Sequence, residues 1–140
     1  MAAALLTMWA LAEALPRLDF DFAARRWAAA ILIAAGLAIG IAAFLQFRRA
    51  DTTINPMTPD RSAALVTTGL YGISRNPIYV ADAVILVGCA LLFANALAFL
   101  AVPLFAAYVQ RFQIAAEERA LRGRFGEPFE AYCRRVRRWL

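Results

Sequence analysis

Residues 27–47 read WAAAILIAAGLAIGIAAFLQF, an apolar run whose one strongly polar member is Gln46. A helix that crosses a bilayer needs about 20 consecutive apolar residues, and this run has that length. Arginine pairs flank it, Arg25-Arg26 before the run and Arg48-Arg49 after it. The stretch therefore predicts a transmembrane helix.

Three further apolar segments predict helices, over 2–15, 78–93 and 96–113. The first is short and lacks the basic start and the small-residue cleavage site of a secretory signal, so we expect a short first span. No charged residue occurs between positions 83 and 110, a stretch too long for one upright span and short for two. Asn95 interrupts its middle, which favours a tight helical hairpin.

The sequence thus predicts an all-α fold, an integral membrane bundle of about four transmembrane helices that forms a single domain over residues 1–140. The last two spans form the hairpin. Residues 48–77 are expected to form a loop, because they are rich in turn-forming Asn, Pro and Gly. Residues 114–140 are expected to form a helical tail.

Composition supports the membrane assignment, since hydrophobic residues make up 63% of the chain and the mean hydropathy is +0.61. Histidine is absent, which excludes histidine-based hydrolytic triads and metal sites, and we expect no metal. Cys89 and Cys133 have neither metal-ligand nor redox spacing and are expected to be free thiols. The net charge of +5 comes from arginines beside apolar segments, so lipid headgroups are expected as partners and nucleic acid is not.

The arginines also predict an orientation. With a cytoplasmic amino terminus, four spans place twelve of the fifteen arginines inside and leave only Arg17, Arg25 and Arg26 outside, as the positive-inside rule requires. We expect a multi-pass protein of the inner (plasma) membrane whose loop and tail, and any active site, face the cytoplasm. The arginines of residues 134–138, together with Trp139, predict a lipid-headgroup anchor.

Two adjacent carboxylates follow the last apolar segment. On a regular helix Gln110, Gln113 and Glu117 form one polar stripe. Glu118 lies about 100° away and has Arg122 four residues later as a local ion-pair partner. Glu117 has no such cation nearby, which makes it the better candidate for binding a cationic ligand.

Other polar side chains have a functional and a structural interpretation each. Asp82, close to the start of the third span, is either a functional acid or an interfacial one. Arg75 precedes Asn76-Pro77 and could orient an anionic group at the helix start or anchor the loop. An ion pair between Arg75 and Glu117, or extension of Glu117 to the membrane surface, also stays open.

Two motifs lie on either side of the expected hairpin. The first is GLYGISRNPIY at residues 69–79. It resembles the Gly-x-Tyr-x-x-x-Arg-His-Pro-x-Tyr motif of the isoprenylcysteine carboxyl methyltransferase and phospholipid methyltransferase superfamily of integral membrane enzymes. The closing signature of that superfamily is matched by Glu117, Glu118, Phe125, Gly126, Phe129, Tyr132 and Val136. The resemblance covers about residues 52–139.

This resemblance implies a bundle that binds S-adenosylmethionine in a pocket facing the cytoplasm and takes a small lipophilic acceptor from the bilayer. It assigns cofactor binding to Ala64, Leu65, Val66, Tyr71, Asn76, Pro77, Ile78, Tyr79 and Glu117. Taken singly, the two tyrosines would be ordinary membrane-interface aromatics.

The chain departs from the superfamily at two positions. Asn76 replaces the usual His, and Gln113 stands where the prenylcysteine enzymes place a substrate-contacting Arg. Loss of that Arg argues against a free carboxylate acceptor, although Arg111 could substitute. No catalytic residue is assigned, and the candidates are Arg75, Asp82, Arg111 and Gln113.

Methyl transfer from a sulfonium depends mainly on alignment and exclusion of water, so a strong base is needed only for an alcohol or ammonium acceptor. Two alternatives to a methyltransferase stay open. One is a non-enzymatic accessory protein that has kept the fold, and the other is a relative of the much longer sterol reductases. We expect Glu117→Ala to abolish cofactor binding and Glu118→Ala to leave it intact.

Overall fold

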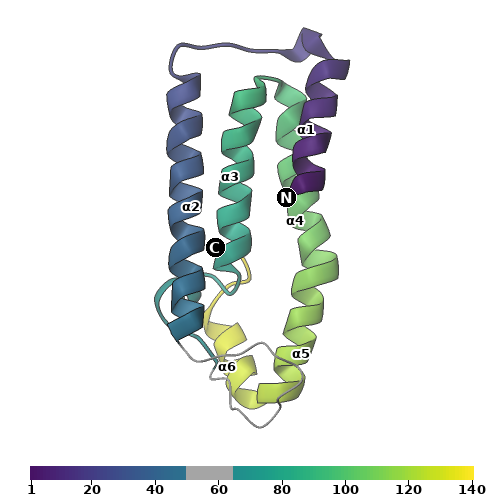
Figure 1. Ribbon diagram of the computed structural model, residues 1–140. Helices are drawn as coiled ribbons and strands as arrows, with labels where there is room; N and C mark the ends of the chain where they lie inside the picture. The colour runs from purple at the N-terminus through teal and green to yellow at the C-terminus, as the bar shows by residue number, and fades with distance from the viewer. Residues whose placement is uncertain (50–64) are drawn as a thin grey trace.

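The computed structural model describes residues 1–49 and 65–140, so most of the predicted loop over 48–77, including Ala64, lies outside the described residues. The described residues form helices and no β-strand beyond two isolated bridges, which confirms the all-α fold class. The helices are α1 (Ala2–Ala14), α2 (Arg25–Arg49), α3 (Pro77–Phe93), α4 (Ala101–Val109), α5 (Ala115–Phe125) and α6 (Glu127–Arg135). They are joined by the 3₁₀ turns η1 (Pro16–Leu18), η2 (Gly69–Gly72) and η3 (Ala96–Leu100) and the π-helical turn η4 (Gln110–Ile114). Helices α1 to α4 stand side by side, and α5 and α6 lie at one end of the bundle (Figure 1).

Two helices are long and apolar enough to cross a membrane. They are α2, with 25 residues, and the 30-residue helix from Ala96 to Phe125, each of which contains an apolar stretch of 18 residues with at most two charged side chains. Helices α1 and α3 are apolar but have 13 and 17 residues, which at about 1.5 Å per residue is less than the roughly 30 Å of hydrocarbon in a bilayer.

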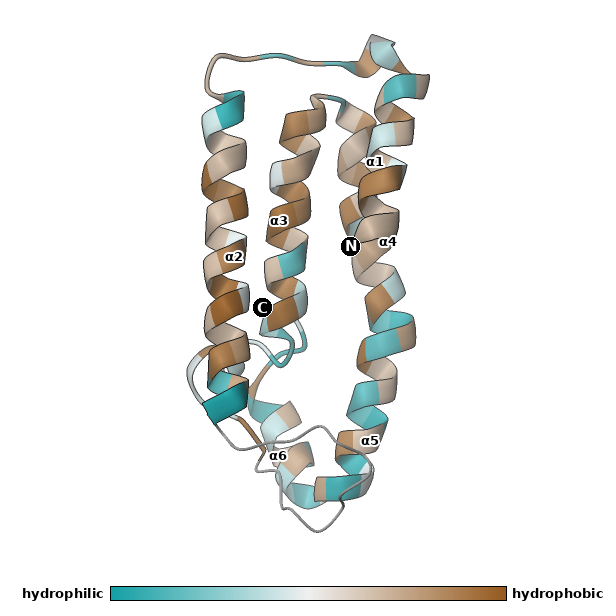
Figure 2. Cartoon of the chain, viewed as in Figure 1, coloured by the Kyte–Doolittle hydropathy of each residue, from teal (hydrophilic) through white to brown (hydrophobic). Residues whose placement is uncertain are grey.

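Apolar and polar residues separate along the bundle axis. Figure 2 shows the long parallel part of α2, α3 and α4 as mainly apolar, whereas α5, α6 and the adjoining turns are largely hydrophilic. On α2 the apolar side chains face outward, since Trp27, Ile31 and Ile41 are 75%, 67% and 59% exposed. An outward apolar surface of this kind fits lipid and not water. We refer to the hydrophilic end as the polar end.

Close packing of α2 against α3 depends on two glycines. A Cβ at Gly36 would lie 2.9 Å from the carbonyl oxygen of Ala81, and one at Gly88 would lie 3.0 Å from that of Ala29. Any side chain there would force the helices apart, because the atoms in the way are backbone. Small residues that bring two backbones together are the usual basis of helix pairing in membranes.

The end of the bundle opposite the polar end is tied by Asn95, which is fully buried. Its Nδ2 donates to the carbonyl oxygen of Leu15 at 2.9 Å and to Oδ1 of Asp19 at 2.8 Å. Nearby, Nη1 of Arg25 donates to the carbonyl of Leu91 at 2.8 Å, in the last turn of α3, where a cation also complements the helix dipole. These contacts fix how α1, α2 and α3 meet.

The last apolar helix continues into the predicted tail, as expected for residues 110–117, and a membrane span that ends at residue 113 stays a prediction. The helix runs without interruption from Ala96 to Phe125, because no Gly or Pro occurs between Pro103 and Gly123 to break it. Instead, the turn η4 is π-helical. A π turn contains one extra residue, so it rotates the residues that follow and sends Gln110, Gln113 and Glu117 to different surroundings. The prediction that these three residues form a single polar stripe assumes a regular helix and is therefore wrong.

Candidate functional site

The turn η2 begins the polar-end structure and is attached to α2. Oε1 of Gln46 accepts a hydrogen bond from the backbone N–H of Leu70 at 3.0 Å, which explains the one strongly polar residue of the long apolar run. Gly69 has a φ of +59° and a Cβ there would collide with the Gln46 amide, so this turn requires glycine. The turn places Tyr71, which is only 9% exposed, beneath the end of the bundle.

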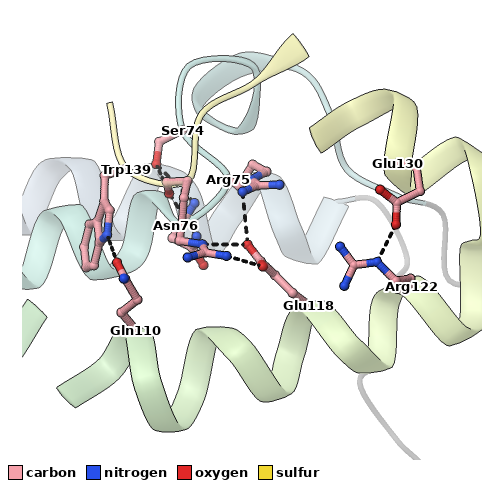
Figure 3. A network of polar contacts seen from close by, with 9 residues as sticks. Ser74, Arg75, Asn76, Gln110, Glu118, Arg122, Glu130 and Trp139 are labelled. Carbon is pink, nitrogen blue, oxygen red and sulfur yellow. Dashed lines mark hydrogen bonds and ion pairs between the residues drawn. The ribbon is translucent and has the colours of Figure 1, made fainter. Parts of the chain in front are cut away.

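The carboxyl-terminal residues 136–139, which we call the strap, run back over the segment that leads into α3. The backbone N–H of Arg75 donates to the carbonyl of Arg137 at 3.0 Å. Nδ2 of Asn76 donates to the carbonyl of Arg138 at 2.9 Å, and Nε1 of Trp139 donates to Oε1 of Gln110 at 2.9 Å. Figure 3 shows Asn76 and the bond between Trp139 and Gln110. Arg138 and Trp139 thus hold the fold together, and contact of this segment with lipid headgroups stays a prediction.

Glu118 is the centre of that network. Its carboxylate accepts from Nε and Nη2 of Arg138 at 3.0 and 2.7 Å and lies 3.2 Å from Nη2 of Arg75. Burial by itself would raise the pKa of Glu118, but the hydrogen bond from Arg138 and the charges of Arg75 and Arg138 outweigh burial and lower it. Glu118 is thus a buried anion with a structural task.

The predicted local ion pair between Glu118 and Arg122 is wrong, because Arg122 pairs with Glu130 of α6 (Figure 3). The alternative pair of Arg75 with Glu117 is also wrong, since Arg75 pairs with Glu118. The first prediction failed because local helical spacing does not reveal that Glu130 of α6 is the partner of Arg122. The second alternative chose the wrong one of two adjacent glutamates for a contact across the bundle.

Glu117 differs from the adjacent Glu118 in its exposure and in its hydrogen-bond partner. It is exposed, and its Oε1 accepts a hydrogen bond from the Tyr79 hydroxyl at 2.7 Å. No arginine among residues 1–49 and 65–140 lies within ion-pair distance of it. The structure therefore leaves a carboxylate oriented by a tyrosine and available to a cation.

A cavity of about 240 Å³, the polar-end cavity, brings these groups together. Its wall combines aromatic rings with the charged pair. The lining residues are Phe47, Tyr71, Arg75, Asn76, Pro77, Ile78, Tyr79, Glu117, Glu118, Leu121, Phe129 and Tyr132. Six of the nine residues predicted for cofactor binding are among them.

The other three predicted residues are not in this wall. Leu65 packs against the buried cluster of Phe129, Tyr132 and Val136, Val66 is half-buried outside the lining, and Ala64 lies outside the described residues. Sequence reasoning missed Phe47, Glu118, Leu121, Phe129 and Tyr132 as wall residues. Phe129 and Tyr132 belong to the closing signature and could have been included, whereas Phe47 and Leu121 carry no local signal.

Polar atoms in the wall are of two kinds. The Tyr132 hydroxyl donates to the carbonyl of Tyr71 at 2.7 Å, and burial raises the pKa of Tyr132 to about 12 and that of Tyr71 as well, so both stay neutral at physiological pH. In contrast, Nε of Arg75 is buried and has no hydrogen-bond partner among the residues the structure describes. A buried donor without a partner is rare in folded proteins, and this one belongs to a residue that lines the cavity.

A second cavity of about 520 Å³, the inter-helix cavity, lies between α1, α3 and α4. It is mainly apolar, and its polar members include Thr7, Tyr79, Asp82 and Gln113. Tyr79 lines both cavities. Of the four candidate catalytic residues, Asp82 and Gln113 line this cavity and Arg75 lines the other, while Arg111 is exposed and lines neither.

Within the described part of the chain there is no cluster of three or more His, Cys, Asp or Glu side chains that could hold a metal ion. Cys89 and Cys133 are both free thiols, as expected.

Comparison with known proteins gives two matches. A family model described as phospholipid methyltransferase matches residues 24–128. A protein of Haemophilus influenzae (strain Rd), described as "Uncharacterized protein", is 40% identical over 63 residues, which is 45% of this chain and all of that protein. The region that the family model matches includes α2, α3 and α4. It also includes most of the residues that line each cavity.

Proposed function

The chain belongs to the phospholipid methyltransferase family, as its two motifs predicted, and on that premise we propose that it transfers a methyl group from S-adenosylmethionine to a small lipophilic acceptor. The family is one of membrane methyltransferases that act on lipids. The cofactor, its site and the acceptor's entry from the bilayer are our proposal.

The polar-end cavity has the groups that a zwitterionic amino-acid moiety requires. Nε of Arg75 is a buried donor in need of a partner and suits a carboxylate, whereas Glu117 is a carboxylate without a cation and suits an ammonium or sulfonium. The aromatic wall of Phe47, Tyr71 and Phe129 suits a flat heterocycle. The observed residues therefore fit S-adenosylmethionine.

The single observation that carries the proposal is the position of Tyr79. It lines the polar-end cavity and the inter-helix cavity, and its hydroxyl is held by Glu117 at 2.7 Å. A donor in the first cavity and an acceptor in the second would thus meet beside one ordered side chain. Such alignment of two reactants is the main contribution an enzyme can make to this reaction.

When bound, S-adenosylmethionine supplies an electrophilic methyl group on a sulfonium. The chain's own residues would hold and shield it. Tyr79 keeps its proton on Oη, shared with Oε1 of Glu117, and so orients the carboxylate. The apolar lining of the inter-helix cavity excludes water, which strengthens every charge interaction at the junction.

We further propose a four-span arrangement with the polar end in the cytoplasm and the α3–α4 hairpin turning at Asn95. In support, α2 and the helix from Ala96 to Phe125 have spanning length, and α1 and α3 are shorter apolar helices packed beside them. The arginines at 48, 49 and 75 and those after 110 all occur toward the polar end, as the positive-inside rule requires for a cytoplasmic face.

The proposal is tested by methyl transfer into lipid. Membranes from cells that produce the protein are incubated with S-adenosylmethionine labelled in its methyl group, and the organic extract is counted. We expect label above that of membranes without the protein, lost in Glu117→Ala and retained in Glu127→Ala, a surface glutamate of α6. An unlabelled extract from folded, cofactor-binding protein would favour the accessory-protein alternative.

A further inference from the structure

We infer that Arg138, on the strap, is a positioning residue that keeps Arg75 available for the carboxylate of the bound cofactor. This inference rests on the proposed function, because it concerns the same site and the same ligand. It is drawn from the way in which Glu118 divides its oxygens between the two arginines. Arg138 lies outside the lining of the polar-end cavity, so its effect on a ligand there must pass through Glu118 and Arg75.

Glu118 is held mainly by Arg138. Nε and Nη2 of Arg138 donate to Oε1 and Oε2 of Glu118 at 3.0 and 2.7 Å, the two-point arrangement in which a guanidinium and a carboxylate fit best. Arg75 reaches only Oε1, from Nη2 at 3.2 Å (Figure 3). The Nε of Arg75 is buried and has no hydrogen-bond partner among the described residues. The division of Glu118 thus leaves Arg75 with a donor for a ligand.

The three side chains together carry one positive charge, because two guanidinium groups share a single carboxylate. No other carboxylate of residues 1–49 and 65–140 lies within ion-pair distance of Arg75 or Arg138. Arg75 and Glu118 are largely buried, and an unbalanced charge in such surroundings is costly. A ligand carboxylate bound at Arg75 would balance it.

Loss of Arg138 would change what Arg75 can do. Glu118 would then have Arg75 as its one partner, and both of its oxygens would be open to Nε and Nη2 of that arginine. A two-point pair is stronger than the present single contact, and it would be neutral. It would also use the Nε donor itself. By holding Glu118 from the other side, Arg138 keeps this closed pair from forming.

Backbone contacts place Arg138 where it can do this. Its carbonyl accepts from Nδ2 of Asn76 at 2.9 Å, and the carbonyl of Arg137 accepts from the backbone N–H of Arg75 at 3.0 Å. The strap is therefore tied to the segment that holds Arg75. Coupling between two binding events is reciprocal, so a carboxylate that binds Arg75 should in turn stabilise the docked strap.

A ligand without the carboxylate tests the inference. S-adenosylmethionine and its decarboxylated form, which keeps the ammonium and the sulfonium, are titrated by calorimetry into the detergent-purified full chain. The wild type is expected to bind S-adenosylmethionine at least about tenfold more tightly, as for one charged hydrogen bond, and Arg138→Gln to reduce this preference to below about threefold. A variant that only loosened the fold would lose affinity for both compounds and keep their ratio.

Arg137→Gln is the matched control. It removes the same charge from the same strap at an exposed side chain and leaves the backbone bond to Arg75 in place, so the preference should equal that of the wild type. An unchanged preference in folded Arg138→Gln would overturn the inference.

Hydrogen exchange of the wild type covers the case in which Arg138→Gln fails to fold. Saturating S-adenosylmethionine should slow exchange in the peptide that contains residues 136–139 at least about threefold more than the decarboxylated form does, because only the carboxylate is coupled to the strap. Equal protection by the two compounds would contradict the role of Arg138. Failure of both compounds to bind the folded wild type would instead overturn the proposed function, and this inference with it.

Discussion

At the scale of single residues, two adjacent glutamates in α5 have opposite tasks. Glu118 is 8% exposed and holds Arg75 and Arg138, whereas Glu117 is exposed and its carboxylate accepts a hydrogen bond from Tyr79. Neighbours on a helix point about 100° apart, and although both line the polar-end cavity, Glu118 is paired with Arg75 and Arg138 whereas Glu117 has no cation. The first is needed for the fold and the second is available for a ligand.

Glu118→Gln should therefore destabilise the protein in a pH-dependent way. The lowered pKa of Glu118 means that its ionised form stabilises the fold above the ordinary glutamate pKa and loses this effect as pH falls through the folded-state pKa. We expect the variant to be less stable by about 2 kcal/mol at pH 7, since two arginines lose their partner. The difference should shrink as the pH falls below 4.5, as measured by thermal melting in detergent.

Glu130→Gln serves as the control, because its pair with Arg122 is largely exposed and such pairs contribute little. A pH-independent difference for Glu118→Gln would show that the carboxylate is not the ionised centre of the network. The ion pair between Glu118 and Arg75 also revises the expectation for Glu118→Ala. This substitution should now weaken cofactor binding indirectly, because it removes the partner that holds Arg75.

A local pattern identified one part of this site and not the other. The resemblance of residues 69–79 to the superfamily motif predicted the wall residues Tyr71, Asn76 and Tyr79, and helical spacing favoured Glu117 over Glu118 as a ligand-binding carboxylate. The partners of Glu118 come from 20 residues later and from before α3. Their approach depends on the strap, which no periodicity in the sequence signals.

At the scale of elements, the pairing of α2 with α3 depends on the absence of a side chain at Gly36. We expect Gly36→Leu to destabilise the protein by about 3 kcal/mol or more, because a Cβ would lie 2.9 Å from a backbone carbonyl and the helices cannot repack around it. Thermal melting of the purified variant in detergent measures this loss.

Gly40→Ala is the matched control on the same helix, since a Cβ there meets the Cβ of Ala81 at an ordinary 3.5 Å. Its stability should stay within about 0.5 kcal/mol of the wild type. Equal effects of the two substitutions would contradict the close α2–α3 contact.

The strap makes a separate prediction at this scale. Asn76→Asp removes the Nδ2 donor to the carbonyl of Arg138 and places a carboxylate against it, so the strap should loosen. Hydrogen exchange measured by mass spectrometry should then show faster exchange of the Arg75 amide, which donates to Arg137. Unchanged protection would mean that the side chain of Asn76 does not hold the strap.

At the scale of the whole molecule, the fold class and the family could be predicted from the sequence. The cavities could not, because they form only where several helices pack together. The apolar runs predicted an all-helical membrane protein, and the paired motifs predicted its family. The two cavities could not be predicted, because their walls combine α1, α3 and α4 in one case and α2, η2, α3, α5 and α6 in the other. The helix through residues 110–117 was expected, but its π-helical turn η4 was not, because no residue type in the sequence signals it.

Orientation is testable at the same scale. In a background without Cys89 and Cys133, a cysteine at exposed Arg135 should react with a membrane-impermeant maleimide only after the cells are permeabilised, whereas one at exposed Ala23 should react in intact cells. The reverse pattern would place the polar end outside the cytoplasm and contradict the proposed topology.

The central claim is that the polar-end cavity holds S-adenosylmethionine between Arg75 and Glu117. Calorimetric titration of S-adenosylmethionine and its demethylated product into the detergent-purified protein tests this directly, beside Glu117→Ala and the surface control Glu127→Ala. The account predicts binding that is lost in Glu117→Ala and unchanged in Glu127→Ala. Absence of binding to folded wild-type protein, or equal binding by both variants, would contradict it.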